Sequence, residues 1–353
     1  MINNTLYMND IINSINNTKG IEQLKNKKVF ITGATGLIGS YLVDLLMHLN
    51  NDAYNITVIA NARDYKNIQL RFSHYESNNL FKYYIGDVND NINYNEDIDI
   101  IINCASNTHP KQYSTDPIGT IMTNINGTNN VLSFANDKHA KKVIFLSSVE
   151  IYGENINNIE RFKENDMGYI NCNTLRAGYN EAKRAGEALC QAYIENKGLD
   201  ISIVRLPRIF GPTVKKDDSK VMSQFINKAL LKENIVLKSE GTQFFSYLYV
   251  ADAVSGILTV LNTGKIGEVY NLGNIECDVR LVDLANEIAN IANTKVVFEL
   301  PDEIEKKGFS KASVARLDYS KISNELGWTP SYSMKEALKR TIDILEEESN
   351  TSN

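Results

Sequence analysis

The chain has 353 residues, a formal net charge of −6 at pH 7 and 43% hydrophobic residues. This length allows one large unit or two coupled lobes, and the acidic balance gives no support to nucleic acid or an anionic membrane as a partner. The four cysteines form no C-x-x-C pair, histidines are few, no apolar run could span a membrane and the first residues are polar, so we expect a cytoplasmic protein without a metal site.

A glycine-rich turn dominates the first part of the chain. Residues 1–26 predict a short amphipathic helix or arm, and a buried strand over 29–31 then leads into Gly33, Gly36 and Gly39. A helix begins inside this turn, so its free amide groups face an anion, while glycine permits positive φ and a close approach of phosphate to the backbone. Such a triplet is a weak signal by itself, because any strand, turn and helix can contain one.

The end of the second predicted strand, Ile56 to Ala60, bears on the choice of dinucleotide. In doubly wound sheets a carboxylate here binds the ribose hydroxyls of NAD, whereas an arginine suits the extra phosphate of NADP. Here the neutral Asn61 and Ala62 come first, and Arg63 and Asp64 follow. The pattern favours NADP, with two alternatives left open: Asp64 can turn inward, and Arg63 can lie on the adenine or in solvent.

Small or short polar residues follow three further predicted strands. These strands cover residues 83–85, 98–103 and 143–146. Asp87 follows the first of them, Ser106 follows the second, and Ser147 to Gly153 follow the third. Such residues line the ligand cleft of a doubly wound sheet. Asp87 is equally well explained as a turn residue or a helix N-cap.

A predicted helix over 178–195 places Tyr179 and Lys183 on one face, because they are four residues apart. Free tyrosine has a pKa near ~10, and an adjacent ammonium favours the phenolate and lowers that pKa toward neutral values. A Tyr-x-x-x-Lys pair is common on exposed helices. Placed after the fifth strand and a serine-bearing strand end, however, it predicts a base for hydroxyl groups and a lysine that holds a ribose.

The second half of the chain predicts a smaller lobe, because its segments shorten and alternate less regularly. Before it we expect a helix over 117–136 and a sixth strand over 201–206. After them we expect strands over 235–238, 243–249, 268–272 and 295–299, and helices over 219–231, 251–261, 281–292 and 334–346. The predicted fold class is α/β, a doubly wound parallel sheet of Rossmann type with a smaller, interleaved C-terminal substrate lobe. Its parts are an arm (1–26), a dinucleotide-binding domain (27–206 plus about 250–274), a substrate-binding lobe (about 207–249 plus 275–346) and a tail (347–353).

The order of these motifs resembles the extended short-chain dehydrogenase/reductases, and within them the nucleotide-sugar epimerases, dehydratases and decarboxylases, over about residues 27–345. The UDP-glucuronate decarboxylase branch is the most similar, by Ser106–Pro110, Asp116–Pro117, Gly211–Pro212, Asp217–Lys220 and Leu326–Pro330. The resemblance implies cofactor contacts at Gly33, Thr35, Gly36, Leu37, Ile38, Gly39, Arg63, Asp87, Val88, Ala105, Tyr179 and Lys183. It also implies catalysis by Ser148, Tyr179 and Lys183, a nucleotide-diphosphate sugar as substrate, and a homodimer formed through the helices that hold Asn124 and Tyr179.

Two departures from the relatives bear on the reaction. Similar sugar 4,6-dehydratases have an Asp-Glu pair after the catalytic hydroxyl, and this chain has Val149 and Glu150 there. Valine cannot donate a proton, so the elimination lacks its general acid, while Glu150 serves as a base, as a substrate ligand or only to order the loop. Relatives also have an arginine in the late strand where this chain has Phe245. Without it a diphosphate or sugar carboxylate lacks a bidentate partner.

A compensating set of cations is our hypothesis for the substrate site. Arg208 replaces an asparagine that faces the diphosphate in relatives, and Arg316 lies near another diphosphate arginine. Together with Lys220 and the wall formed by Phe245, they are expected to hold the diphosphate in a rearranged pocket. The alternative is that one or two of these three cations are surface charges, above all Lys220.

These features predict an NAD(P)-dependent oxidoreductase that transfers a hydride at a carbinol or keto carbon of a nucleotide-activated sugar, in surface-polysaccharide precursor synthesis. An epimerase or a ketosugar reductase fits the two departures best, and Arg63 favours the reductase if it binds the 2′-phosphate of NADPH. The alternatives are a nucleotide-sugar decarboxylase or 4,6-dehydratase, and a catalytically silent dinucleotide-binding sensor or scaffold. An intact Ser148, Tyr179 and Lys183 argue against the silent protein.

Overall fold

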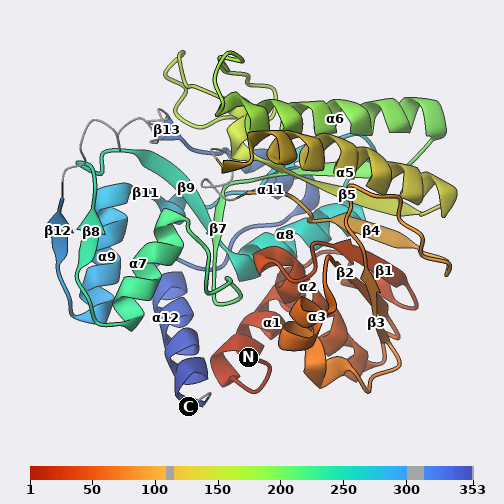
Figure 1. Cartoon of the computed structure of the whole chain (residues 1–353), viewed down its shortest axis with the longest axis horizontal. Helices are drawn as coiled ribbons and strands as arrows, with labels where there is room; N and C mark the ends of the chain where they lie inside the picture. Colours follow the sequence, from red (N-terminus) through yellow and green to blue (C-terminus); the bar gives the residue numbers. More distant parts are fainter. Residues whose placement is uncertain (109–114, 300–313, 352–353) are drawn as a thin grey trace.

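A computed structural model describes residues 1–108, 115–299 and 314–351 of the chain. His109 and Pro110 of the quoted motif and part of the predicted substrate lobe and tail lie outside these residues. The centre is a seven-stranded sheet in the order β10-β6-β5-β4-β1-β2-β3 (Figure 1). All its pairings are parallel. The strands are β1 Lys28–Thr32, β2 Thr57–Ala62, β3 Phe81–Ile85, β4 Ile100–Asn103, β5 Lys142–Ser148, β6 Ile201–Leu206 and β10 Val269–Asn271.

Helices cover both faces of this sheet, and the apolar strand residues alternate between two cores. In β1, Val29 and Ile31 lie in one core and Phe30 in the other, as the alternation of side chains along a strand requires. One face carries α2 Leu37–Leu49, α3 Tyr65–Phe72 and α8 Val250–Thr263, and the other carries α5 Pro117–Asp137 and α6 Ala177–Lys197 (Figure 1). The predicted doubly wound α/β fold is confirmed.

A second group of elements lies at one end of the large sheet. Its strands are β7 Arg208–Phe210, β8 Ile235–Leu237, β9 Phe244–Tyr249, β11 Asp278–Arg280, β12 Val296–Phe298 and β13 Val314–Ala315, and its helices are α7 Val221–Leu230, α9 Leu281–Ala292 and α12 Met334–Thr351. Helix α11, Ser320–Leu326, packs instead against α8 and β10 of the large sheet. β9 pairs with β7, β11 and β13, while β8 pairs with β12 in a separate sheet. Because β10 returns to the large sheet between β9 and β11, the two groups interleave along the chain. The lobe boundaries given above stay a prediction.

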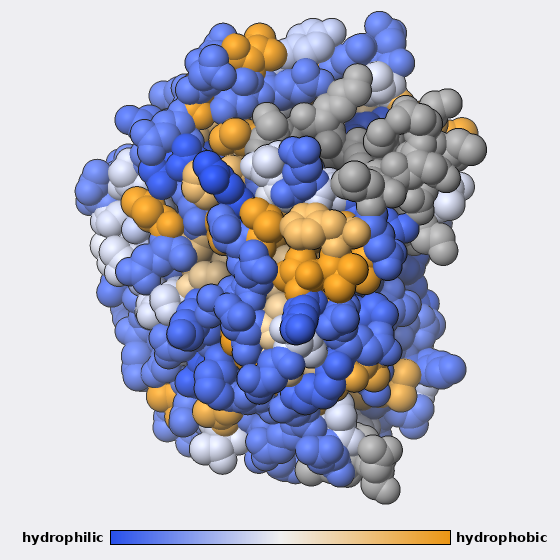
Figure 2. All heavy atoms as spheres, turned by 90° about the vertical axis from the view of Figure 1, so that its left-hand side faces the viewer, coloured by the Kyte–Doolittle hydropathy of each residue, from blue (hydrophilic) through white to orange (hydrophobic). Residues whose placement is uncertain are grey.

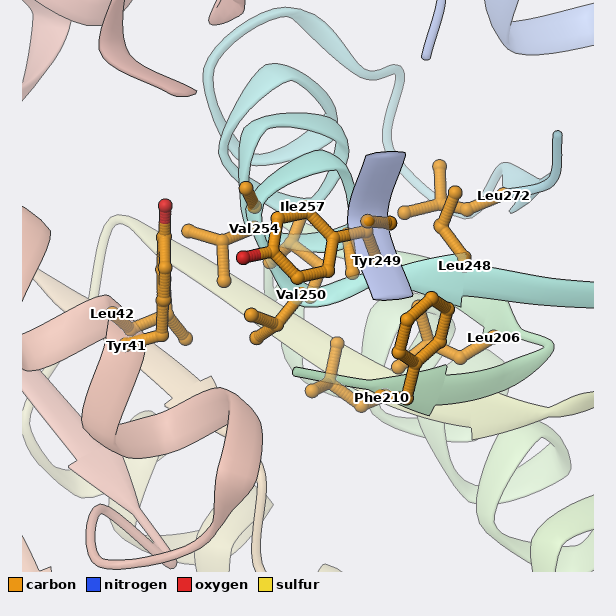
Figure 3. Close-up of a cluster of buried hydrophobic side chains, with 14 of the residues drawn as sticks. Tyr41, Leu42, Leu206, Phe210, Leu248, Tyr249, Val250, Val254, Ile257 and Leu272 are labelled. Atoms are coloured by element: carbon orange, nitrogen blue, oxygen red, sulfur yellow. The ribbon is translucent and has the colours of Figure 1, made fainter. Parts of the chain in front are cut away.

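The two groups share a core that Figure 3 shows in close-up. Tyr249 and Val250, at the junction of β9 and α8, lie between Tyr41 of α2 and Phe210 of β7. The Tyr249 and Phe210 rings are 5.7 Å apart between centroids. Each fully buried aromatic or aliphatic side chain here contributes about 2 kcal/mol through removal from water. The small sheet is therefore fixed against the large sheet and its helices by the main core.

The N-terminal segment forms helix α1, Thr5–Asn17, and it is no peripheral arm. Tyr7 and Ile11 are fully buried, and Asp10 between them is buried as well. Asp10 accepts hydrogen bonds from the hydroxyl of Tyr249 at 2.6 Å and from Nε of Arg340 at 2.7 Å. Of the two predicted alternatives, the helix is the one present. Its packing was not predicted, because the pattern shows that one face of the helix is apolar but not what covers it.

Most predicted elements occur within a few residues of their expected bounds, and the short ones were missed. No strand was expected at β7, β11 or β13, because two or three residues are too few to show alternation. Helix α3 was missed since only Ile68 and Phe72 along it are buried. Helix α11 was also not expected.

The face with β8 and β12 is mostly hydrophilic, with one compact hydrophobic patch near its centre (Figure 2). The exposed apolar residues of β12 are Val297 and Phe298. Within the described ranges, no helix has both the length and the apolar character that a membrane crossing needs.

Candidate active site

The glycine turn between β1 and α2 has the geometry of a phosphate cradle. Gly33 has φ +60°, and a Cβ there would lie 2.9 Å from the Cα of Ala105, at the end of β4. A Cβ on Gly39 would lie 2.5 Å from the carbonyl oxygen of Gly33. Gly36 is the N-cap of α2 and offers no side-chain cap, so the first amides of the helix face outward. These residues fit a dinucleotide pyrophosphate. Thr35, Leu37 and Ile38 lie half-buried around the same turn.

The strand ends beside the turn hold the other predicted cofactor residues. Arg63 is exposed directly after β2. The carboxylate of Asp64 caps α3 by accepting from the backbone of Asn67 at 2.9 Å, so its inward turn is not seen. Asp87 accepts from the backbone of Asn89 at 2.9 Å, which is the turn role weighed above. Val88, next in the chain, is buried.

The hydroxyl groups of the predicted catalytic residues meet at the end of β5 and the start of α6. Ser148 is the last residue of β5, and its hydroxyl oxygen accepts from the backbone of Glu150 at 3.2 Å. The Tyr179 hydroxyl is hydrogen-bonded to Ser148 and to Ser106, and burial raises the pKa of Tyr179 to about 12. Ser106 in turn donates to Asn124 on α5 at 2.7 Å. The result is a fixed chain of hydroxyl groups at the carboxyl edge of the sheet.

Lys183 is buried one turn along α6, but it does not lower the pKa of Tyr179 as predicted. Its ammonium donates to the carbonyl oxygen of Leu146 at 2.9 Å and lies 6.0 Å from the centre of the Tyr179 ring. Burial lowers the pKa of Lys183 itself to about 8, against the opposing charge of Glu187. The prediction was wrong in direction because burial of the phenol, and after it the negative charge of Glu150, raise the pKa of Tyr179.

A buried polar network supports the segment that carries Ser148. Arg205 on β6 makes two bonds to the carboxylate of Glu187, at 2.9 and 2.7 Å. It also donates to the hydroxyl of Tyr152 at 2.9 Å. Ser147 donates to Glu187 at 2.5 Å. Because every charge in this network has partners, it holds the 3-10 turn after β5 in place.

Glu150 lies between two arginines, next to Ser148. Its carboxylate is 3.4 Å from Nη2 of Arg208 and 4.0 Å from Nη2 of Arg176. The guanidinium carbon of Arg208 stands 3.6 Å from the centre of the Phe245 ring. Val149, which replaces the dehydratase acid, is buried. The structure therefore brings together Glu150, Arg208 and Phe245.

Arg316 and Lys220 are not brought to this place. Arg316 stacks on Phe244 at 4.3 Å. Because successive side chains of β9 point to opposite faces, it lies on the other face from Arg208 and Phe245. Lys220 precedes α7 and pairs with Asp218 at 3.7 Å. The expected three-cation site is thus reduced to Arg208, because the strand register turns Arg316 away.

Two site residues escaped the sequence prediction. Ser106 was noted at a strand end but was given no role, although it bonds the Tyr179 hydroxyl. Arg176, near Glu150, lies three residues before Tyr179, a spacing that puts both on one helix face. That spacing was the available signal.

Comparison with known proteins agrees with this geometry. Residues 29–273 match the NAD dependent epimerase/dehydratase family. UDP-glucuronic acid decarboxylase 1 of Danio rerio is 29% identical over 330 residues, which cover 94% of this chain and 75% of the relative. UDP-glucuronic acid decarboxylase 3 of Arabidopsis thaliana is 30% identical, over 89% of this chain and 87% of the relative.

Solved structures share the fold at lower identity. The dTDP-glucose 4,6-dehydratase of Bacillus anthracis in complex with NAD superposes with a TM-score of 0.75 at 20% identity, covering 92% of this chain and 98% of that chain. The UDP-glucuronic acid 4-epimerase of Bacillus cereus, in complex with UDP-glucuronic acid and NAD, gives a TM-score of 0.75 at 23% identity, covering 91% and 99%. At these sequence identities, the similarity to the solved structures shows a shared fold.

Proposed function

The chain belongs to the NAD dependent epimerase/dehydratase family, and from this premise we propose that it transfers a hydride between a nicotinamide and a carbinol or keto carbon of a nucleotide-activated sugar. The observation that carries the proposal is the hydrogen-bonded pair of Tyr179 and Ser148 at the sheet edge that also holds the glycine turn.

Each residue of the pair has a role at the reacting oxygen. In oxidation, the Tyr179 phenolate removes the proton of the sugar hydroxyl while Ser148 hydrogen-bonds the same oxygen. In reduction, the Tyr179 phenol returns the proton to the ketone oxygen. A bound nicotinamide accepts or supplies the hydride. Lys183 binds the nicotinamide ribose, and Ser106 keeps the Tyr179 hydroxyl oriented through its own bond to it.

An epimerase or a ketosugar reductase is the reaction that we propose first. The buried side chain of Val149 supports this choice, since an aliphatic group at the acid position cannot protonate a leaving hydroxyl. Epimerisation needs only the oxidation and then the reduction of one carbinol carbon, and the reductase needs only the reduction of one keto carbon.

A decarboxylase is the second candidate, and one contact favours it. Arg208 puts a guanidinium beside Glu150, so a cation is present although Phe245 occupies the arginine position of the relatives. The named relatives are UDP-glucuronic acid decarboxylases. Oxidising the carbon next but one to a sugar carboxylate gives a β-keto acid, which loses carbon dioxide without a further acid.

One assay separates these reactions. The purified protein is incubated with UDP-glucose, UDP-galactose, UDP-glucuronic acid and a 4-keto nucleotide sugar, with oxidised and reduced cofactors, and the products are identified by NMR. An epimer without net change of cofactor indicates an epimerase, consumption of reduced cofactor a reductase, and carbon dioxide a decarboxylase. Tight cofactor binding without turnover of any sugar would favour the silent sensor instead.

Cofactor choice rests on two opposed observations. The exposed guanidinium of Arg63 supports NADP, whereas the family description and the NAD-bound structures support NAD. If Arg63 binds the 2′-phosphate, Arg63→Ala weakens NADPH binding about 10-fold and leaves NADH binding unchanged. If the substitution leaves the affinity for NADPH as well as that for NADH unchanged, NAD is assigned as the cofactor.

We also propose a homodimer formed through α5 and α6, which lie side by side as the outermost layer in Figure 1. Ile118 at the start of α5 is 74% exposed and Leu175 before α6 is 69% exposed. Exposed apolar side chains gathered near two helix starts are typical of a contact surface. A cytoplasmic location stays a prediction.

A further inference from the structure

Two arginines stack on neighbouring phenylalanines of β9, and only one of them faces the catalytic group. Arg208 stacks on Phe245, and Arg316 stacks on Phe244 on the opposite face. The pairing of β7 with β9 sets Arg208 opposite Tyr247, which lies on the same face as Phe245. The register of the small sheet therefore selects Arg208 as the guanidinium beside the reaction.

A continuous set of contacts joins Arg208 to the reacting oxygen. Its Nη2 is 3.4 Å from Glu150, whose backbone amide donates to Ser148 at 3.2 Å. Ser148 is bonded to the Tyr179 hydroxyl. Since Tyr179 and Ser148 share the sugar oxygen in the proposed function, a group bound to Arg208 lies beside the sugar ring.

Arg208 has unused bonding capacity in this position. Its Nη1 is buried and has no hydrogen-bond partner among the residues that the structure describes. Its one ion pair, to Glu150, is longer than a typical charge-assisted hydrogen bond. An unmade bond at a buried donor is costly, so an acceptor oxygen that reaches Nη1 gains that free energy on binding.

Phe245 fixes the plane of the guanidinium. A ring centre 3.6 Å from the guanidinium carbon holds the planar group face-on and directs its N–H groups sideways toward Glu150. Lysine has no plane to stack and no fork of donors, so it cannot replace arginine here. Phe245 is thus a positioning residue for Arg208.

We propose that Arg208 binds an oxyanion of the sugar substrate beside the reacting carbon, and that Phe245 positions it for this purpose. The inference deepens the proposed function and rests on it. The oxyanion is either a carboxylate on the sugar or the nearest diphosphate oxygen, and both have the same chemistry for a guanidinium.

Calorimetric titration of the full chain with NADH tests the proposal, using UDP-glucuronic acid, UDP-glucose and UDP as probes. Arg208→Gln is expected to weaken binding about 10- to 30-fold. A loss confined to UDP-glucuronic acid identifies the carboxylate, and an equal loss for all three probes identifies the diphosphate. Affinities within about twofold of wild type for every probe, or no binding of any probe by the wild type, would overturn it.

Arg316→Gln is the matched control, because it removes the same kind of stack from the other face of β9. We expect it to leave all three affinities within about twofold of wild type. Thermal melting of both variants establishes that each is folded. A wild-type protein that binds the probes but converts no nucleotide sugar contradicts the proposed function alone.

The positioning role of Phe245 has a separate readout. Phe245→Leu is expected to raise KM about 3- to 10-fold with little change in kcat, and to have no further effect in the Arg208→Gln background. An equal effect of Phe245→Leu with and without Arg208 would show that Phe245 only shapes the wall of the pocket.

Discussion

Tyr179 is the residue on which the proposed chemistry depends, and its surroundings favour the protonated form. Burial raises the pKa of Tyr179 to about 12, so the phenol keeps its proton at neutral pH and can donate it to a ketone oxygen. The reverse step needs the phenolate. The positive charge of an oxidised nicotinamide nearby favours that form, since an opposite charge lowers the pKa of an acid.

Removal of this hydroxyl is the first prediction. Tyr179→Phe is expected to lower kcat by about 100- to 10,000-fold, because the proton of the sugar hydroxyl loses its acceptor. The affinity for NADH should stay unchanged, as the ring remains in place. Fluorescence titration of NADH and product formation measure the two effects, and a variant that keeps a large share of wild-type kcat would exclude Tyr179 as the proton-transfer group.

The second prediction concerns the buried charge of Lys183. Its pKa is about 8 in the folded chain against 10.5 for a free lysine, so between these pH values the unfolded chain binds more protons and stability rises with pH. Lys183→Met removes the buried charge and also the bond to Leu146. At pH 7 we expect the cofactor-free variant to be about 2 kcal/mol more stable than wild type.

Urea unfolding at a series of pH values checks this effect. The gain should shrink as pH rises through the pKa of Lys183 and vanish near the pKa of free lysine, because wild type then no longer buries a charge. A variant that is less stable than wild type at neutral pH would contradict the account.

At the scale of elements, the hydrophobic periodicity of the sequence predicts those helices and strands whose formation depends on residues of the same segment. The strands of the large sheet are nearly continuous apolar runs, as in Ile100–Asn103, and the helices of the cofactor half have long repeats. β7 could not be predicted, because its three residues form a strand only through pairing with β9. The same pairing determines which arginine lies in the site, since it sets Arg208 beside Glu150 while Arg316 lies on the other face of β9.

The placement of the proposed catalytic residues in the fold was largely predictable, and their electrostatics were not. The order of the glycine turn, Ser148, Tyr179 and Lys183 along the chain identifies the family, which the comparisons confirm. The direction of the Tyr179 pKa shift depends on burial and on where the ammonium of Lys183 is held. Both are tertiary properties that a spacing of four residues does not contain.

The third prediction concerns helix α1, which joins the first and last parts of the chain. The buried carboxylate of Asp10 binds Arg340 of α12 and the hydroxyls of Tyr249 and Tyr332. Asp10→Asn leaves a partly buried guanidinium without its counter-charge, so we expect a loss of about 3 kcal/mol in the free energy of unfolding. The urea midpoint falls while its slope stays constant.

Asp52→Asn is the matched control, because Asp52 is exposed. We expect it to change stability by less than about 0.5 kcal/mol. Equal stabilities of the Asp10 variant and wild type would mean that α1 is dispensable for joining the two groups of elements.

At the scale of the whole molecule, the large sheet carries the glycine turn and the hydroxyls of the proposed catalytic residues, and the small sheet places Arg208 beside Glu150. The face formed by α5 and α6 is the surface that we propose for a second copy. The fourth prediction is that Leu175→Glu converts a homodimer into a monomer, because it puts a charge into a desolvated contact.

Light scattering after size-exclusion chromatography measures the mass of this variant. Leu70→Glu on α3 is the matched control, since Leu70 is 75% exposed on another face of the molecule. It should leave the dimer intact. A monomeric wild type, or a Leu175 variant that stays dimeric, would contradict the proposed interface.

The central claim is that this chain transfers a hydride between a nicotinamide and a sugar carbinol or keto carbon through the Tyr179 and Ser148 pair. Transfer of deuterium, detected by mass spectrometry of the quenched mixture, tests it most directly: from C4-deuterated UDP-glucose, UDP-galactose and UDP-glucuronic acid to the oxidised cofactor, and from C4-deuterated NADH or NADPH to a 4-keto nucleotide sugar. We predict label on the accepting partner in at least one of these mixtures and none with Tyr179→Phe. No transfer of label in any mixture, in a protein that binds both cofactor and sugar, would contradict the claim.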